Sequence, residues 1–467
     1  MGLALALAVF LAAPSAALPD PGLQALVSSG VLPGLHWPNF TRLQPDVAGF
    51  YELNGYQLAW VRAGLVTRQG RALMGVLQNA ALKGLDPDDY DAWRWNLPDA
   101  GPERFDLALS VSAIRYIHDV SSGKVDPAVF DFGLKFHQPR CDLREAAYGL
   151  INSPDVVAAL ERLEPPFEGY WRTEKALEQY LALARDVHRI RQLQLVLERW
   201  RWVPHSFARP PIVVNIPEFR LRAYNAEYRP VLEMKVVVGK AYHHKTPVFS
   251  SEMTHVIFRP YWDVPLSIQR AELAPELAKD PEYLAKNDYE IVDSGRHVVS
   301  KGPVSTDMLE QIRSGKLFVR QTPGDKNALG LIKFLFPNEY DVYLHGTPAK
   351  ALFLRTRRDF SHGCIRVEKP EELALWVLRG VPGWDLDRIR AAEKGTDSLR
   401  VNLAKPIPVL IVYGTAVVSP DGEVHLFADI YGFDAELEEV LDHGYPYSGW
   451  QPASVRTSAN RELRRTR

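Results

Sequence analysis

Leu197-Glu198-Arg199-Trp200-Arg201-Trp202-Val203-Pro204 marks the point at which the chain changes from helical to strand-like periodicity. Upstream of the proline, residues 187–202 carry apolar side chains at the spacing of an amphipathic helix, namely Ile190, Leu193, Leu197 and Trp200. Downstream, short segments rich in β-branched residues are separated by Asn, Gly and Pro, as is typical of strands. These segments are 212–216, 220–224, 232–238, 254–258, 342–345, 409–413 and 424–427. The pattern predicts an α+β protein with an N-terminal helical domain and a β-rich domain after it.

The sequence before residue 187 is mostly helical in its periodicity. Residues 71–83 place apolar side chains on one stripe, and Gly84 follows where a helix would end. Residues 105–120 repeat this pattern. Between 267 and 338 the strand texture is interrupted by two helical segments, 270–279 and 306–314. We therefore expect a mixed α/β insertion over the β core.

Composition excludes several classes of protein. The chain has 467 residues, of which 46% are apolar and 24% charged, so it can bury a large core and is not disordered throughout. The net charge of −2 argues against nucleic-acid binding driven by a basic surface. Two cysteines exclude both a disulfide framework and a multi-cysteine zinc module.

The two ends of the chain carry distinct signals. An apolar run from Leu3 to Ala13 is followed by Pro14-Ser15-Ala16-Ala17, which predicts a secretory signal peptide over residues 1–18. The run is too short to span a membrane, and a buried apolar helix is the alternative. No Lys or Arg precedes Arg42 to supply the usual positive region. Residues 454–467 contain five arginines and one glutamate, and we expect a solvated basic tail there.

The residues best suited to chemistry lie in Ser361-His362-Gly363-Cys364-Ile365-Arg366. His345-Gly346-Thr347-Pro348 precedes this motif, with 15 residues between His345 and Ser361. A cysteine transfers acyl groups as the thiolate, which a nearby imidazole generates by accepting the proton. Gly363 allows a tight turn whose backbone N–H groups can face an oxyanion. These are the components of a thiol acyltransferase.

Two other interpretations of these residues are weaker. A cysteine of this kind can be a small core residue, and histidines are often polar core residues. Cys364, His362 and His345 could nominally hold zinc, but no further cysteine stands nearby and no HExxH helix exists. We therefore predict no metal and no organic cofactor.

The motif resembles the signature of L,D-transpeptidases with a YkuD-type catalytic domain. The resemblance extends to the large periplasmic subgroup that carries a helical scaffold, through segments on both sides of the motif: 79, 84–87, 123–127, 197–202, 214–217, 237–240, 246–250, 261–265, 323–324, 327–330, 333–334 and 429–432. The chain departs from that subgroup because residues 181–186 run directly into 187–190, which leaves no room for its peptidoglycan-binding module. Asp263 and His243-His244 also differ from the residues usual there.

The resemblance implies roles for the residues of the motif. Cys364 would be the nucleophile and His345 its base, held in the productive tautomer by the Gly346 carbonyl. The N–H groups of Gly363 and Cys364 would line the oxyanion hole. The substrate side would comprise residues that fix the turn or form the groove: Ser361, His362, Arg366, Tyr261 and Trp262. Arg366 would either pin the turn or meet a substrate carboxylate.

The resemblance also implies a domain organisation. We expect a signal at 1–18, a helical scaffold domain at 19–205, and a catalytic domain at 206–418 whose lid is the insertion at 267–338. A C-terminal hairpin and helix at 419–453 would return to the scaffold, and a disordered tail would occupy 454–467.

The implied function is peptidoglycan cross-linking through a Cys364 thioester, with 3-3 or 1-3 linkages. Stem peptides would be the partners, without nucleic acid or a membrane span after signal cleavage. The protein would reside in the periplasm and react with carbapenems. Alternatives are an L,D-carboxypeptidase or endopeptidase, a lipoprotein-anchoring enzyme, or a non-catalytic wall-binding scaffold.

Two further features have simpler interpretations. Cys141 lies far from the motif, and we interpret it as an incidental thiol. Residues 86–91 look like the start of a calcium loop but lack glycine at the sixth position and glutamate at the twelfth, where Leu97 stands. An acidic, capped turn is the expected structure.

Overall fold

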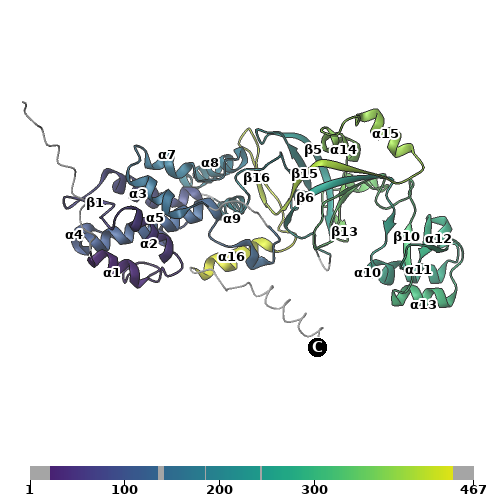
Figure 1. Cartoon of the computed structure of the whole chain (residues 1–467), viewed down its shortest axis with the longest axis horizontal. Coiled ribbons are helices and arrows are strands. Elements are labelled where there is room, and N and C mark those ends of the chain that lie inside the picture. Colours follow the sequence, from purple (N-terminus) through teal and green to yellow (C-terminus); the bar gives the residue numbers. More distant parts are fainter. Residues whose placement is uncertain (1–20, 135–140, 185, 242–243, 445–467) are drawn as a thin grey trace, which may run out of the picture. The chain divides into compact units, whose positions relative to one another are not determined.

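The computed structural model describes residues 21–134, 141–184, 186–241 and 244–444. The described residues form two compact units, one from those within 1–124 and 139–165, the other from those within 125–138 and from 166 onward (Figure 1). The predicted signal at 1–18, the predicted tail at 454–467 and His243 lie outside the described residues. Within the described ranges, no helix combines the length and apolar character needed to cross a membrane.

The first unit is helical and is packed around one long helix, α5 (Pro102–Ser122), nearly all of whose residues are buried. Asp106 in this helix accepts hydrogen bonds from the Tyr51 hydroxyl (2.7 Å) and the Trp60 amide (2.7 Å). Burial raises the pKa of Asp106 to about 6. The other elements are α1 (Pro21–Ser29), α2 (Gln44–Leu53), β1 (Val61–Arg62), β2 (Leu65–Val66), α3 (Arg68–Gln78), η1 (Ala80–Lys83), η2 (Pro87–Tyr90), α4 (Leu97–Ala100), α6 (Leu143–Ile151) and α7 (Val156–Glu161).

The helix predicted at 71–83 is divided at Asn79 into α3 and the 3₁₀ turn η1. The Asn79 side chain donates to the Gly75 carbonyl (2.8 Å), and this local bond competes with continuation of the α-helix. Gly84 ends η1 with φ of 71°, as predicted. Asp86 accepts a hydrogen bond from the Asp88 amide (3.0 Å) and caps η2, which confirms the capped acidic turn.

The second unit is built on a closed sheet. Its strands are β3 (Ile212–Asn215), β4 (Arg220–Tyr224), β5 (Pro230–Gly239), β6 (Phe249–Phe258), β11 (Ile332–Leu335), β12 (Leu344–His345), β13 (Asp359–Ser361), β14 (Ile365–Val367) and β15 (Leu399–Val412). Among the described residues they pair in the order β13-β5-β14-β12-β11-β6-β15-β3-β4. β4 also pairs with β5, so the sheet closes on itself. Closure hides strand edges that would otherwise be open to pairing with other chains.

The insertion is a separate layer with its own core (Figure 1). In the described part of the chain, a sheet in the order β7-β10-β8-β9 is formed by β7 (Trp262–Asp263), β8 (Tyr289–Val292), β9 (Val298–Ser300) and β10 (Phe318–Gln321). The helices are α10 (Leu266–Ile268), the π-helix η4 (Gln269–Leu273), α11 (Ala274–Lys279), α12 (Tyr283–Lys286) and α13 (Thr306–Ser314). Buried Gln269 ties them together, because its side chain bonds to the backbone of Ile312, Leu317 and Val319.

The lid range predicted at 267–338 needs correction at both ends. Its sheet begins earlier, with β7, and its last strand, β10, ends at Gln321. Residues 332–335 form β11, which pairs with β6 in the closed sheet. The cause of the error is that a short strand of the core follows the insertion without any change of local periodicity.

Two helices that precede the sheet in sequence belong to its compact unit. α8 (Glu168–Ala182) and α9 (Val187–Arg201) pack against the hairpin of β16 (Ala416–Val418) and β17 (Val424–Leu426). The compact units therefore divide before α8, whereas the sequence placed a domain boundary at 205. The hairpin also starts three residues before the predicted boundary at 419. The remaining elements are η3 (Pro127–Phe130), η5 (Lys350–Leu354), α14 (Pro370–Leu378), α15 (Leu386–Lys394) and α16 (Phe433–His443).

Candidate active site

Strand pairing brings the two halves of the motif together. β12 and β14 are parallel neighbours, with His345 opposite Arg366, and the Ile365 amide donates to the Tyr343 carbonyl (3.1 Å). Cys364 immediately precedes β14 and therefore lies beside Tyr343. The pairing of β12 with β14 thus brings together two parts of the motif that are separated by 15 residues in the sequence.

The polar side chains of these strands share one face of the sheet. Lys333 on β11 is directly opposite His345, which in turn is opposite Arg366. Tyr343 lies beside these side chains, because its ring contacts both the His345 ring and Lys333 Nζ, and it hydrogen-bonds to Cys364. The opposite face carries apolar side chains that are fully buried, among them Phe334, Leu344 and Ile365. The core thus holds the strands, and the other face is left for chemistry.

His345 is held in a defined tautomer. Its Nδ1 lies 2.6 Å from the Gly346 carbonyl oxygen, which can only accept, so Nδ1 carries the hydrogen and Nε2 has a free lone pair. The side chain is buried, with 4% of the residue exposed. Burial and the nearby cations Arg366 and Lys333 lower the pKa of His345 to about 3. The imidazole is therefore neutral at pH 7 and able to accept a proton. The predicted orienting role of Gly346 agrees with this contact.

Cys364 is a free thiol whose Sγ lies 3.6 Å from the Asp341 carbonyl oxygen. Burial raises its pKa, although hydrogen bonds from Tyr343 and the charge of Lys333 act in the opposite direction. Both members of the pair are thus neutral at rest. The thiol proton must therefore be transferred for Cys364 to act as a nucleophile.

The turn that carries the nucleophile, residues 361–364 (the catalytic turn), is fixed by its own hydrogen bonds. Gly363 has φ of 115°, which residues with a side chain rarely adopt. The Ser361 hydroxyl donates to the Cys364 carbonyl (2.5 Å) and accepts from the Gly363 amide (3.2 Å). The Gly363 N–H is therefore engaged within the turn, which differs from its predicted place in an oxyanion hole. Ser361 holds the turn and is not free to bind substrate.

A second set of hydrogen bonds anchors the catalytic turn from outside. Buried Thr246 donates through its hydroxyl to the Gly363 carbonyl (2.7 Å) and accepts from the Gly239 amide (2.9 Å). The Tyr431 hydroxyl accepts from the Thr246 amide (3.1 Å) and donates to the Gly239 carbonyl (2.6 Å). No role for Thr246 or Tyr431 was predicted from the sequence, because neither stands near the motif.

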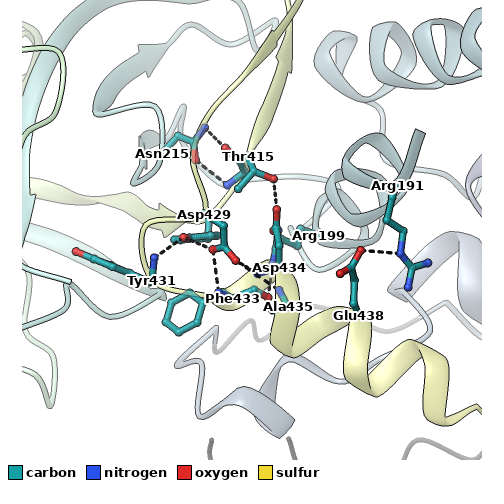
Figure 2. Close-up of polar contacts among 12 residues, drawn as sticks. Arg191, Arg199, Asn215, Thr415, Asp429, Tyr431, Phe433, Asp434, Ala435 and Glu438 are labelled. Atoms are coloured by element: carbon teal, nitrogen blue, oxygen red, sulfur yellow. Dashed lines mark hydrogen bonds and ion pairs between the residues drawn. The ribbon is translucent and has the colours of Figure 1, made fainter. Parts of the chain in front are cut away.

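Tyr431 is itself held through Tyr413: the Tyr431 amide donates to the Tyr413 hydroxyl (2.9 Å), which donates to Asp429 (2.5 Å) in the segment that leads into α16 (Figure 2). Asp429 accepts from the amides of Phe433 (2.9 Å) and Asp434 (3.0 Å) at the start of that helix. Asp434 in turn accepts from Thr415 and pairs with Arg199 of α9. The C-terminal segment thus connects α9 to the strands beneath the catalytic turn.

Gly330 allows the chain to approach the base closely. A Cβ at this position would lie 2.6 Å from the Thr347 nitrogen and 2.8 Å from the Gly346 carbonyl carbon, and φ is 64°. The loop before β11 therefore packs directly on the backbone that orients His345, which requires glycine.

Other predicted substrate residues lie around this site in different ways. His362 contacts Glu272 of η4, with Nε2 and Oε1 2.6 Å apart, and its ring meets that of His244 edge-on. Trp262 hydrogen-bonds to the Tyr343 side chain. Tyr261 is 41% exposed and stacks on Arg320 of the insertion. Asp263 pairs with Arg296 (3.1 Å).

Arg366 makes no hydrogen bond or ion pair with any described residue, and its buried Nε has no partner.

A neutral, oriented histidine on β12 and a cysteine immediately before the neighbouring strand β14 define a site of the class that transfers acyl groups through sulfur. Residues 209–398 match the family model described as the L,D-transpeptidase catalytic domain (YkuD), and residues 45–177 match that of the Scaffold domain. The chain therefore carries a YkuD-type L,D-transpeptidase catalytic domain together with a Scaffold domain. These matches confirm the predicted family and the α+β fold class.

A relative from Haemophilus influenzae supports the same assignment. The protein named "Putative L,D-transpeptidase" is 29% identical to this chain over 300 residues, which cover 64% of this chain and 60% of that protein. The chain thus spans about 60% of the length of the curated relative it matches.

Proposed function

We propose that this protein cross-links peptidoglycan stem peptides through a thioester on Cys364. The observation that carries the proposal is the orientation of His345, whose Nδ1–H donates to Gly346, so that the lone pair is on Nε2. Its depressed pKa keeps it unprotonated across the physiological range. The family match of the catalytic domain supports peptidoglycan as the substrate.

The reaction proceeds in two acyl transfers. Cys364 Sγ attacks the carbonyl carbon of an L-centred stem residue, and its proton passes to His345 Nε2. The C–N bond then breaks, and His345 returns the proton to the departing amine. An amine of a second stem attacks the thioester, loses a proton to His345, and regenerates the thiol. Neither transfer requires a metal or an organic cofactor.

We also propose the periplasm as the place of action, because the substrate lies outside the inner membrane and the sequence predicts export. A carbapenem presents a strained acyl group to the same sulfur, so it should acylate Cys364.

Intact-protein mass spectrometry tests the proposal. The full chain is incubated with a tetrapeptide donor, and the expected result is a mass gain equal to the donor minus its last residue. Cys364→Ala should show no gain, while Cys141→Ala, which removes the other free thiol, should behave as wild type. Mass analysis of the released products then identifies the acceptor as a stem amine, water or a lipoprotein, and separates 3-3 from 1-3 linkages. Equal acylation of Cys364→Ala and wild type would contradict the proposal.

A further inference from the structure

Two cations beside Cys364 lack an anionic partner. Arg366 and Lys333 flank His345 on neighbouring strands and lie on its face of the sheet. Among the described residues, neither side chain makes a hydrogen bond or an ion pair; Lys333 Nζ instead lies 3.8 Å from the centre of the Tyr343 ring. The positive charge of both groups is felt by Cys364. A partly buried charge without a partner is costly unless it has a ligand.

Arg358 shows what a structural arginine looks like in this fold. Its guanidinium donates to the carbonyls of Val236, Phe219 and Arg355, at 3.2, 3.1 and 2.6 Å. Arg366 makes no such contact, and its Nε is buried without a partner. It therefore does not pin the catalytic turn, and its charge is available to another molecule.

The acidic groups near the two cations do not neutralise them. Asp263 is engaged by Arg296 (3.1 Å), and Asp341 acts on Lys333 without forming an ion pair. Cys364 itself is a neutral thiol at rest, because burial raises its pKa. The face around the nucleophile is thus locally positive, which favours a substrate that carries an anion close to its reacting carbonyl.

We propose that Lys333 and Arg366 form a carboxylate subsite for the free C-terminal carboxylate of the residue that is expelled from the donor. This inference rests on the proposed function. The carboxylate of the expelled residue is separated from the reacting carbonyl by a single Cα, and consecutive Cα atoms are about 3.8 Å apart. Lys333 lies one strand from His345, at a strand spacing of about 4.8 Å, and Arg366 lies two residues from Cys364 along β14, so both cations are at matching reach. A side-chain carboxylate of the retained residue lies several bonds further away.

The subsite makes a functional prediction about the donor. It selects stems that end one residue after the reacting carbonyl, because a longer or amidated stem has no carboxylate there. Charge-assisted hydrogen bonds of this kind favour the matched ligand by roughly tenfold to a hundredfold.

The test compares two donors on the full chain. They are a tetrapeptide stem with a free C-terminal carboxylate and the same stem ending in a carboxamide, and the rate of Cys364 acylation is followed by intact mass. Wild type should prefer the carboxylate by roughly tenfold to a hundredfold. Lys333→Met and Arg366→Gln should each reduce this ratio, and the double variant should bring it close to one. Arg400→Gln, which removes an exposed cation on β15, should keep the wild-type ratio.

The outcomes separate the subsite from the reaction itself. If wild type is acylated equally by both donors, the reaction stands and the carboxylate subsite is wrong. If the variants slow both donors but keep the wild-type ratio, the cations act on the thiol, and the subsite is again wrong. If neither donor acylates wild type, the proposed function fails together with the inference.

Discussion

The catalytic turn and the insertion are held in opposite ways. The turn is bound by buried hydrogen bonds that reach Gly239, Thr246 and Tyr431, far from it in sequence. The insertion has its own core and its own sheet, and it meets the turn through Glu272 and His362, which are 51% and 24% exposed at their side chains. The position of the reacting atoms is therefore set by the closed sheet, and the insertion, which we propose as the groove wall, is a separately built part.

The energies of the two kinds of contact differ accordingly. Loss of a partner for a buried hydrogen-bonding group costs about 1–3 kcal/mol, whereas an exposed ion pair contributes about 0–1 kcal/mol. Changes in the turn and its supports should thus affect both stability and chemistry. Changes at the insertion contact should affect substrate handling alone.

Replacement of the base should give the largest effect. Glutamine at position 345 can still donate to the Gly346 carbonyl but cannot take up a proton. We expect His345→Gln to reduce the rate of Cys364 acylation by a factor of about 10²–10⁴, with the fold retained. The measurement is donor acylation by intact mass, with circular dichroism as the control for folding. Acylation within a few-fold of wild type would show that another group is the base.

The same variant also tests how the stability of the fold depends on pH. The pKa of His345 is about 3 in the folded chain and 6.5 in its ordinary state, so the unfolded chain binds the extra proton between these values. Stability from this group is fully present above pH 6.5 and falls as pH drops toward 3, by up to about 1.4 kcal/mol per pH unit. Denaturant unfolding of wild type and His345→Gln between pH 7 and 4 should show a smaller decline for the variant. Parallel curves would mean that His345 titrates normally.

A substitution behind the base tests whether the closed sheet sets its position. Gly330→Ala would place a methyl group against the Thr347 and Gly346 backbone at a positive φ, and should destabilise the fold by about 2–4 kcal/mol. Acylation should also slow, because the carbonyl that orients His345 must move. Gly75→Ala is the matched control: its Cβ meets nothing within 4 Å in helix α3, and it should stabilise by about 0.5–1 kcal/mol. If Gly330→Ala changed neither stability nor acylation, the loop before β11 would not support the base.

Local sequence patterns predicted many of the helices and strands, and the motif predicted the central residues of the candidate site. The strand at 220–224 and the helix at 306–314 have the predicted bounds, because alternation and capping act within a few residues. The resemblance of the motif also implied that His345 and Cys364 act as a pair. The place of Lys333 was not predicted, since it depends on the register of β11 against β12. The roles of Thr246 and Tyr431 depend on contacts more than a hundred residues apart in sequence, which periodicity does not encode.

The smallest effect is expected where the insertion meets the catalytic turn. Glu272→Gln keeps an acceptor for His362 Nε2 but removes the carboxylate charge, and the pair is half-exposed. Stability should change by less than about 1 kcal/mol. Glu276→Gln, which breaks an exposed pair with Lys279 on α11, is the matched control within the insertion.

The rates of Cys364 alkylation and of donor acylation then show whether the catalytic turn and the insertion act separately. Alkylation of Cys364 by a small thiol reagent reports the catalytic turn alone, and it should be the same in wild type, Glu272→Gln and Glu276→Gln. Donor acylation also requires the groove wall, and it should fall several-fold in Glu272→Gln while Glu276→Gln stays unchanged. If Glu272→Gln slows alkylation as much as acylation, the contact with His362 holds the nucleophile itself. The insertion would then be part of the support of the catalytic turn, and the division between a fixed reaction centre and a separate groove wall would be wrong.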